Sequence, residues 1–184
     1  MRITGGILKG RQISVPPGEI RPSMDRMRES VFACLCSSGG DLSGLSFLDI
    51  FTGSGIIALE AASRGVSFIE AVEQDKLKRK ALLENVSISP VRINCRFMPA
   101  ELYVKRARTP FDIIFLDPPF PYQFKWELIA NIALSNLVSN GTKILMHRPR
   151  PDYLQTEISN LEKTDSREYG RSVVDFFIYN KTSG

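Results

Sequence analysis

The chain has 184 residues, a hydrophobic content of 43% and a formal net charge of +4. This length allows one sizeable domain with a short appendage, but not two full domains. No apolar run approaches the ~20 residues that a membrane helix requires, and the first residues lack the apolar stretch of a signal peptide. We therefore expect a cytoplasmic protein with no membrane contact.

The spacing of the cysteines and the single histidine make a structural zinc site improbable. The chain has three cysteines and one histidine, His147, and no two cysteines have the C-x-x-C spacing. A structural zinc ion normally takes four ligands at characteristic spacings. We expect free thiols and no bound metal.

Positive charge is concentrated at the start of the chain. The first 28 residues contain Arg2, Lys9, Arg11, Arg21, Arg26 and Arg28, against Glu19 and Asp25 as the acids. Such a cluster can contact a polyanion, although some of its members will be ordinary solvated charges. We take these six basic residues as candidate phosphate contacts.

The opening residues predict a small hairpin followed by a helix. Gly5-Gly6 is a turn signal, and residues 7–15 can form the return strand. Ser23 is a candidate N-cap for a helix whose apolar residues are Met27, Val31, Phe32 and Leu35. The composition changes near residues 37–40, so we divide the chain into a basic extension, 1–40, and a main domain, 41–184.

The main domain predicts short apolar strands that alternate with helices. The strands are expected at residues 46–51, 68–72, 91–97, 112–116, 143–146 and 173–179, and the helices at 56–64, 76–85, 101–106, 124–137 and 153–161. This alternation is typical of a mostly parallel sheet covered on both faces. Tyr169-Gly170 leads into the last strand without a crossover helix, which favours an antiparallel hairpin at the end of the sheet.

A glycine-containing turn follows the first strand of the main domain. Residues 48–55 read Leu-Asp-Ile-Phe-Thr-Gly-Ser-Gly, and Glu73 ends the next strand 20 positions after Gly53. Glycine permits a tight turn and a close ligand, and a carboxylate at Glu73 can accept hydrogen bonds from ribose hydroxyls. The same spacing fits a dinucleotide-binding enzyme, so this turn alone leaves the cofactor open.

A second motif, Asp117-Pro118-Pro119-Phe120, follows the strand at 112–116. Two consecutive prolines make a stiff turn that has no N–H donors. The carboxylate of Asp117 and the carbonyl of Pro118 could accept both hydrogens of an exocyclic base amine, while Phe120 stacks on the ring. Such a site would orient the amine for methylation, and Asp117 could take its proton afterwards.

Taken together, these residues resemble a known family. The glycine turn and the Asp-Pro-Pro-Phe motif are similar to class I methyltransferases that methylate amino groups. The segments at 1–6, 9–11, 20–22 and 25–29, with Tyr169-Gly170, resemble the bacterial RsmD-type guanine-N2 methyltransferases of small-subunit ribosomal RNA. This resemblance implies a Rossmann-like seven-stranded sheet, S-adenosylmethionine as cofactor and a guanine of 16S ribosomal RNA as substrate, within a small-subunit particle.

The resemblance also implies roles for single residues. The catalytic residues would be Asp117, Pro118, Pro119 and Phe120; the cofactor contacts would be Asp49, Phe51, Gly53, Ser54, Gly55, Glu73, Ala100 and Glu101. Two departures stand out. Pro99 occupies the place of the acid expected to bind the adenine amino group, and His147 stands where an acid is expected at the end of a strand. We interpret His147 as a surface residue or as an indirect neighbour of the site.

Other functions compete with this interpretation. A DNA adenine-N6 methyltransferase usually has an additional recognition segment, for which the chain has no spare length. A glutamine methyltransferase fits less well, because position 117 is Asp and the opening is basic. A dinucleotide-dependent oxidoreductase leaves the Asp-Pro-Pro-Phe motif without a purpose. A non-catalytic RNA-binding protein with a methyltransferase fold would not need an intact pocket.

Overall fold

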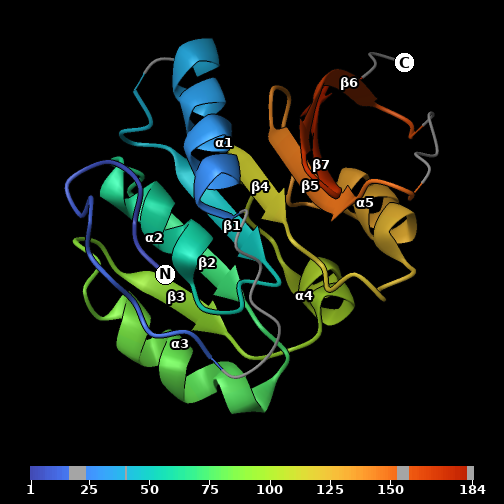
Figure 1. The fold of residues 1–184 in the computed structure, drawn as a ribbon. Helices are drawn as coiled ribbons and strands as arrows, with labels where there is room; N and C mark the ends of the chain where they lie inside the picture. The colour runs from blue at the N-terminus through green and yellow to red at the C-terminus, as the bar shows by residue number, and fades with distance from the viewer. Residues whose placement is uncertain (17–23, 40, 153–157, 182–184) are drawn as a thin grey trace.

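Strands form where short apolar runs are buried on both faces of a sheet. All four residues of β4 (Ile113–Leu116) are buried, and so are all but the first residue of β1 (Ser46–Ile50). β-branched and aromatic side chains suit these positions because they pack well against a pleated surface. The computed structural model describes residues 1–16, 24–39, 41–152 and 158–181, whose seven strands form one sheet in the order β3-β2-β1-β4-β5-β7-β6 (Figure 1).

The other elements follow the predicted alternation. They are α1 (Met24–Gly39), α2 (Ile56–Ser63), β2 (Phe68–Val72), the 3-10 turn η1 (Lys76–Lys78), α3 (Arg79–Val86), β3 (Ile93–Arg96), α4 (Ala100–Arg106), α5 (Lys125–Ala133), β5 (Lys143–Pro149), β6 (Leu161–Tyr169) and β7 (Ser172–Tyr179). All six predicted strands are present, and they differ from the predicted ranges only at their ends. The α/β fold with a mostly parallel sheet is thereby confirmed.

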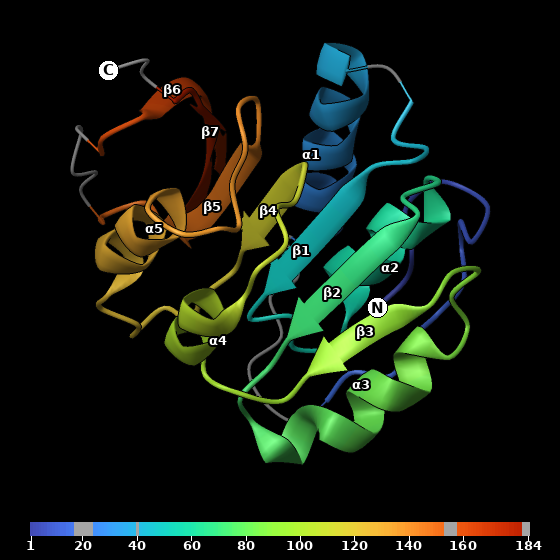
Figure 2. The same ribbon diagram turned by 180° about the vertical axis from the view of Figure 1, so that it is seen from behind.

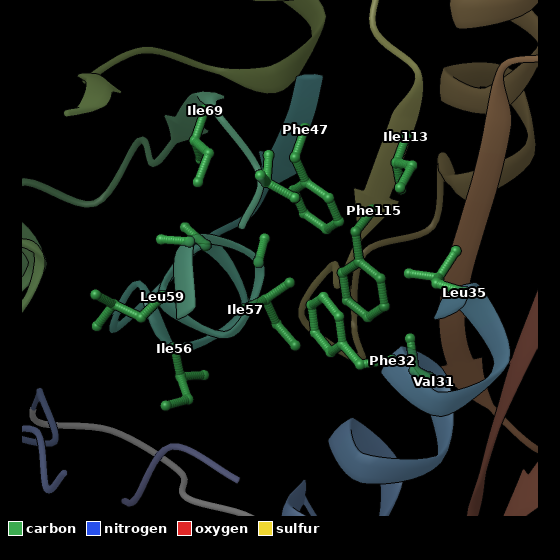
Figure 3. Packing of buried hydrophobic residues seen from close by; sticks show 14 of the residues in the cluster. Val31, Phe32, Leu35, Phe47, Ile56, Ile57, Leu59, Ile69, Ile113 and Phe115 are labelled. Atoms are coloured by element: carbon green, nitrogen blue, oxygen red, sulfur yellow. The ribbon is translucent and has the colours of Figure 1, made fainter. Parts of the chain in front are cut away.

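Two hydrophobic clusters cover the two faces of the sheet. One joins α1 and α2 to the sheet, and the other joins α4 and α5 to it (Figures 1 and 2). Figure 3 shows Val31 and Phe32 of α1 packed beside Phe115 of β4, and the ring of Phe32 stacks on Phe47 of β1 at a centroid distance of 6.0 Å. Because these side chains share one buried cluster, α1 belongs to the same core as the sheet. Burying one such aromatic side chain contributes about 1.5–3 kcal/mol.

The far end of the sheet is antiparallel. β7 pairs antiparallel with both β5 and β6, and Gly170 turns the β6–β7 hairpin at a φ of 61°. The predicted terminal hairpin is therefore confirmed, but the helix predicted over 153–161 is wrong where the structure can test it. Residues 153–157 lie outside the described part of the chain, residues 158–160 are not helical, and β6 begins at Leu161.

The predicted N-terminal hairpin is present in a shorter form. A single antiparallel bridge joins Arg2 to Gln12, and the amide of Ile3 donates to the carbonyl of Arg11 at 2.9 Å. The return strand predicted over 7–15 is wrong in its first half, because residues 5–10 form the turn and Gly6 and Gly10 adopt positive φ values of 74° and 84°. Ser23, the predicted N-cap of α1, lies outside the described residues.

The order of the strands decides where a ligand can bind. β1 and β4 are neighbours in the sheet, although β2 and β3 lie between them in the sequence. In open α/β sheets the crevice beyond the carboxyl ends of such a strand pair is the usual ligand site. Within the described residues, no helix is both long and apolar enough to cross a membrane.

Candidate active site

Two glycines of the turn after β1 differ in their surroundings: Gly55 is closely packed, and Gly53 borders open space. Gly55 has a φ of 82°, and a Cβ on it would lie 2.8 Å from Cδ1 of Leu82, which is too close. Gly53 has a φ of 57°, and a Cβ there would meet nothing nearer than the carbonyl oxygen of Phe51 at 3.9 Å. Gly55 therefore lets α2 pack against α3, while Gly53 leaves room for a ligand beside the backbone.

Glu73 lies where the sequence predicts an acid. Its side chain is buried, Oε2 accepts from the amide of Gly53 at 2.9 Å, and Oε1 accepts from the amide of Asp75 at 2.8 Å. Lys78 lies 3.8 Å from Oε2. These contacts hold the carboxylate in place with lone pairs to spare, so it can accept hydrogen bonds from a ribose without rearranging.

Asp49 is a fully buried acid beneath the glycine turn. Its Oδ2 accepts from the hydroxyl of Thr52 and from the amide of Ala58, whereas Oδ1 has no partner among the described residues. Burial raises the pKa of Asp49 to about 7, and the hydroxyl of Thr52 only partly opposes this shift. A buried carboxylate with one unpaired oxygen would favour a cationic group of a ligand placed beside it.

The Asp-Pro-Pro-Phe motif leaves β4 beside the glycine turn. The amide of Asp117 donates to the carbonyl of Ile50 at 3.2 Å, so the motif begins next to the end of β1. The Asp117 side chain is 22% exposed, and its Oδ1 lies 2.7 Å from Nδ1 of His147. The carboxylate therefore reaches the open side of the turn while one of its oxygens is held from behind.

A buried lysine holds the rest of this loop. Nζ of Lys125 donates to the carbonyls of Phe120, at 3.3 Å, and of Tyr122, and it pairs with Asp152 at 2.8 Å. Three acceptors thus use all three donors of the ammonium group. The loop that carries Phe120 is in this way tied to α5 and to the turn after β5.

One cavity of about 410 Å³ unites the two motifs. Its lining includes Asp49, Phe51, Gly53, Ser54 and Glu73 on the nucleotide side, and Asp117, Pro118, Pro119 and Phe120 on the other side. Small-molecule sites commonly measure 300–1,000 Å³. The structure therefore brings together the two motifs that the sequence connects only through their chemistry.

The family model described as "Conserved hypothetical protein 95" matches residues 1–178. The ribosomal RNA small subunit methyltransferase D of Escherichia coli K12 is 36% identical over 164 residues, which cover 87% of this chain and 76% of that protein. The chain belongs to this family of RsmD-type methyltransferases.

Solved structures agree with the family. The hypothetical protein TTHA0928 of Thermus thermophilus is 29% identical with a TM-score of 0.82, covering 96% of this chain and 98% of that one. The methyltransferase-fold chain SMU.776, solved with S-adenosylhomocysteine (SAH), shares the fold at a TM-score of 0.69 and 16% identity, covering 86% of this chain and 50% of that one.

The cofactor of this RsmD-type methyltransferase is S-adenosylmethionine, and the cavity fits it. The open space at Gly53 leaves room for a ligand against the backbone, and the carboxylate of Glu73 could accept hydrogen bonds from ribose hydroxyls. The unpartnered Oδ1 of Asp49 suits the ammonium or sulfonium charge of the cofactor. When bound, the cofactor supplies an activated methyl group on a positively charged sulfur.

Two expected cofactor contacts lie outside this cavity. Ala100 is buried in the cluster under α4, and Oε1 of Glu101 accepts the hydroxyl of Tyr122 at 2.5 Å. Glu101 lines a separate cleft between α4 and α5. Gly55 is also absent from the lining of the cavity, since its contribution is the packing of α2 against α3.

The candidate phosphate contacts divide into three groups. Arg2, Lys9, Arg11 and Arg26 are exposed, although Arg2 lies 3.4 Å from Asp25. Arg21 lies outside the described residues. The prediction for Arg28 is wrong, because its side chain is fully buried and ion-paired with Glu60 at 3.0 Å and with Asp25 at 2.7 Å.

Sequence reasoning missed several residues that shape the site. His147 is not a surface residue and does not end its strand, since it is 2% exposed within β5, but it lies against Asp117, in agreement with the other interpretation, an indirect neighbour of the site. Met1, Val15 and Pro16 line the cavity from the N-terminal extension, and Lys125 supports the loop from below. The register of β4 and β5 decides between the two interpretations of His147, whereas Lys125 carried no signal because lysine is usually exposed.

Proposed function

We propose that the protein methylates the exocyclic N2 amine of one guanine in 16S ribosomal RNA. The observation that carries the proposal is the single cavity shared by Asp117 and Glu73. One wall suits a nucleoside cofactor, and the other suits a planar base with an amino group. Family membership supports the same reaction class, because the Escherichia coli relative is named as a ribosomal RNA small subunit methyltransferase.

The chemistry follows from the acceptors of the motif. The amine of guanine is a weak nucleophile because its lone pair is delocalised into the ring. The Asp117 carboxylate and the Pro118 carbonyl accept hydrogen bonds from its two hydrogens and favour a tetrahedral nitrogen, while Phe120 supports the ring face. Bound S-adenosylmethionine would supply the methyl group to this nitrogen, and Asp117 would take one of the amine protons.

Ribosomal RNA also explains the basic extension. We propose that residues 1–40 contact RNA and that residues 41–184 carry the catalysis. The exposed side chains of Arg2, Lys9, Arg11 and Arg26 would contact phosphates, together with Arg21. A base must leave its stack to enter the pocket, which costs a few kcal/mol, and phosphate contacts elsewhere can hold the strand while this happens. The substrate would be a small-subunit particle. The enzyme would then act in the cytoplasm, and the reaction would need no metal.

The deciding experiment deletes the gene and maps modified nucleosides in ribosomal RNA by mass spectrometry. We expect one N2-methylguanosine to disappear from 16S RNA, and the purified protein to restore it on RNA or particles from the deletion strain. Methylation of DNA adenine by the purified protein would instead favour the DNA alternative. An intact pattern of modification in the deletion strain would favour a non-catalytic RNA-binding protein.

The basic extension can be tested by a salt series. Neutralising Lys9 and Arg11 together should weaken RNA binding and lower the slope of log K against log salt by roughly one unit per lost phosphate contact. The matched control is Lys105→Ala with Arg108→Ala, which removes the same charge from the end of α4, on the opposite face of the sheet. Equal slopes in the two double variants would place the RNA elsewhere.

A further inference from the structure

We propose that His147 is a positioning residue that holds Asp117 ready to accept the target amine. This inference rests on the proposed function, because it assigns a second layer to the same site. It concerns a side chain that the resemblance predicts to be an acid, and that this chain replaces with its only histidine.

The sheet itself brings the two side chains together. β4 and β5 are parallel neighbours in which Leu116 is registered with Met146. The next residues along the two strands are Asp117 and His147, and Nδ1 of the ring lies 2.7 Å from Oδ1 of the carboxylate. The imidazole is 2% exposed and the carboxylate is 22% exposed, so the histidine lies behind the acid as seen from the cavity.

The polarity of this contact follows from the two groups. An ionised carboxylate only accepts hydrogen bonds, so Nδ1 of His147 must carry the proton that joins them. Nε2 is buried without a partner among the described residues, and a bare ring nitrogen costs less there than an unpaired N–H or a full positive charge. The neutral tautomer with its proton on Nδ1 therefore fits this environment.

The contact with His147 gives the two oxygens of the Asp117 carboxylate different roles. Oδ1 is engaged by the ring, which fixes the plane of the carboxylate, and Oδ2 is left for the amine in the cavity. An acid at position 147 would place two carboxylates against each other and could not donate this hydrogen bond. A misplacement of about 1 Å near a reacting atom can cost about 100-fold in rate, so a fixed orientation has catalytic value.

The tautomer of His147 can be observed directly by NMR. Because the chain has one histidine, its spectrum contains signals from a single pair of ring nitrogens. We expect ¹⁵N NMR of the full chain, labelled at histidine, to show a protonated nitrogen at Nδ1 and a bare nitrogen at Nε2. Asp117→Ala should change the Nδ1 signal and the exchange of its proton. A proton on Nε2, or a ring spectrum unchanged in Asp117→Ala, would overturn the proposal whatever the substrate proves to be.

Activity provides the second arm. His147→Asn keeps an N–H donor near the position of Nδ1, whereas His147→Leu has a similar size and no donor. We expect single-turnover methylation to fall about 10- to 100-fold in the leucine variant and about threefold or less in the asparagine variant, with cofactor affinity and KM for RNA unchanged in both. Equal rates in the two variants would overturn the proposal.

Two controls separate this result from other failures. Thermal unfolding shows whether each variant is folded, and His147→Phe, which keeps a ring without nitrogens, is a second variant that lacks the donor. The assay uses whichever nucleic acid the wild-type protein methylates. If the methylated base proves not to be guanine, the proposed function is refuted. The ratio of methylation rates between the asparagine and leucine variants would still test the role of His147.

Discussion

Two buried polar clusters lie at opposite ends of α2. The anchor cluster, at its carboxyl end, consists of Thr4, Arg28, Glu60 and Arg64; the site cluster, at its amino end, consists of Asp49, Asp117 and His147. Both bury charge beside the same helix. They differ in how completely their hydrogen bonds are satisfied.

In the anchor cluster, donors surround a single carboxylate. Glu60 is fully buried and accepts from the amide and hydroxyl of Thr4, each at 2.9 Å, and from the guanidinium groups of Arg28 and Arg64. Among the described atoms of this cluster, Nη1 of Arg28 is the one buried group without a partner. The cluster fastens the N-terminal extension to α2 and leaves nothing aimed at a cavity.

The site cluster leaves polar atoms unused around a cavity. Oδ1 of Asp49 and Nε2 of His147 lack partners within the described residues, and Asp117, whose Oδ1 contacts His147, lines the cavity. Each unpaired buried polar atom costs about 1–3 kcal/mol, so these groups lower the stability of the fold. The anchor cluster thus leaves one buried nitrogen unpaired, whereas the site cluster leaves two buried atoms unpaired, one of them on Asp49, which lines the cavity.

The largest expected effect comes from a substitution in the site cluster. Asp117→Ala should lower methyl transfer about 10²- to 10⁴-fold while cofactor affinity stays normal, because its carboxylate acts on the amine. Single-turnover assays with tritiated cofactor, together with calorimetry, measure both quantities. Asp117→Asn is the matched control, since it keeps an acceptor oxygen and should retain more activity. Near-normal turnover in Asp117→Ala would contradict the assigned role.

Glu60→Ala tests the structural role of the anchor cluster. Removing this carboxylate leaves the buried Arg28 with Asp25 as its remaining ion-pair partner, which should lower the free energy of unfolding by about 3–5 kcal/mol. Urea denaturation measures the change. Glu60→Leu combined with Arg28→Met removes both charges and should recover most of the loss. If Glu60→Ala cost as little as a surface ion pair, the anchor cluster would not hold the extension.

A smaller effect is expected at the edge of the site cluster. Glu73→Ala should weaken binding of S-adenosylmethionine by roughly 1.5–3 kcal/mol for each hydrogen bond that is lost. Glu73→Gln retains one acceptor and should lie between the alanine variant and the wild type in calorimetric titrations. Equal affinities for all three proteins would move the ribose to another part of the cavity.

The smallest effect concerns pH and Asp49. Its carboxyl ionises near 3.8 in the unfolded chain but keeps its proton up to about 7 in the fold. Between these values the folded state binds more protons, so this group lowers the free energy of unfolding as pH rises from about 4 to about 7. Asp49→Asn should flatten this part of the stability curve.

Cofactor binding should show the opposite trend at Asp49. A cationic ligand favours the carboxylate, so its affinity in the wild-type protein should fall as the pH drops below about 7. Calorimetric titrations from pH 6 to pH 8.5, compared with Asp49→Asn, measure this difference. A wild-type affinity as flat as that of the asparagine variant would separate Asp49 from the charge of the cofactor.

Sequence reasoning identified the two motifs that line the cavity because each motif is local in the chain. Gly53 lies within a few residues of its strand, and Asp117 directly follows one, so strand ends and turn chemistry were enough to place both. The same local reasoning failed at β6. Its sequence, Leu-Glu-Lys-Thr-Asp-Ser-Arg-Glu-Tyr, is an edge strand with mostly polar side chains, and β7 rather than its own apolar pattern makes it a strand.

What the sequence determined by itself was the alternation of apolar strands with helices, the glycine turn and the Asp-Pro-Pro-Phe motif, since each depends on neighbours along the chain. Only the tertiary structure decided the partners of distant charges. Arg28 was predicted to contact phosphate and is buried beside Glu60, and His147, interpreted as a surface residue or an indirect neighbour of the site, lies against Asp117. Burial and strand register set these contacts, and both arise only when segments far apart in the chain pack together.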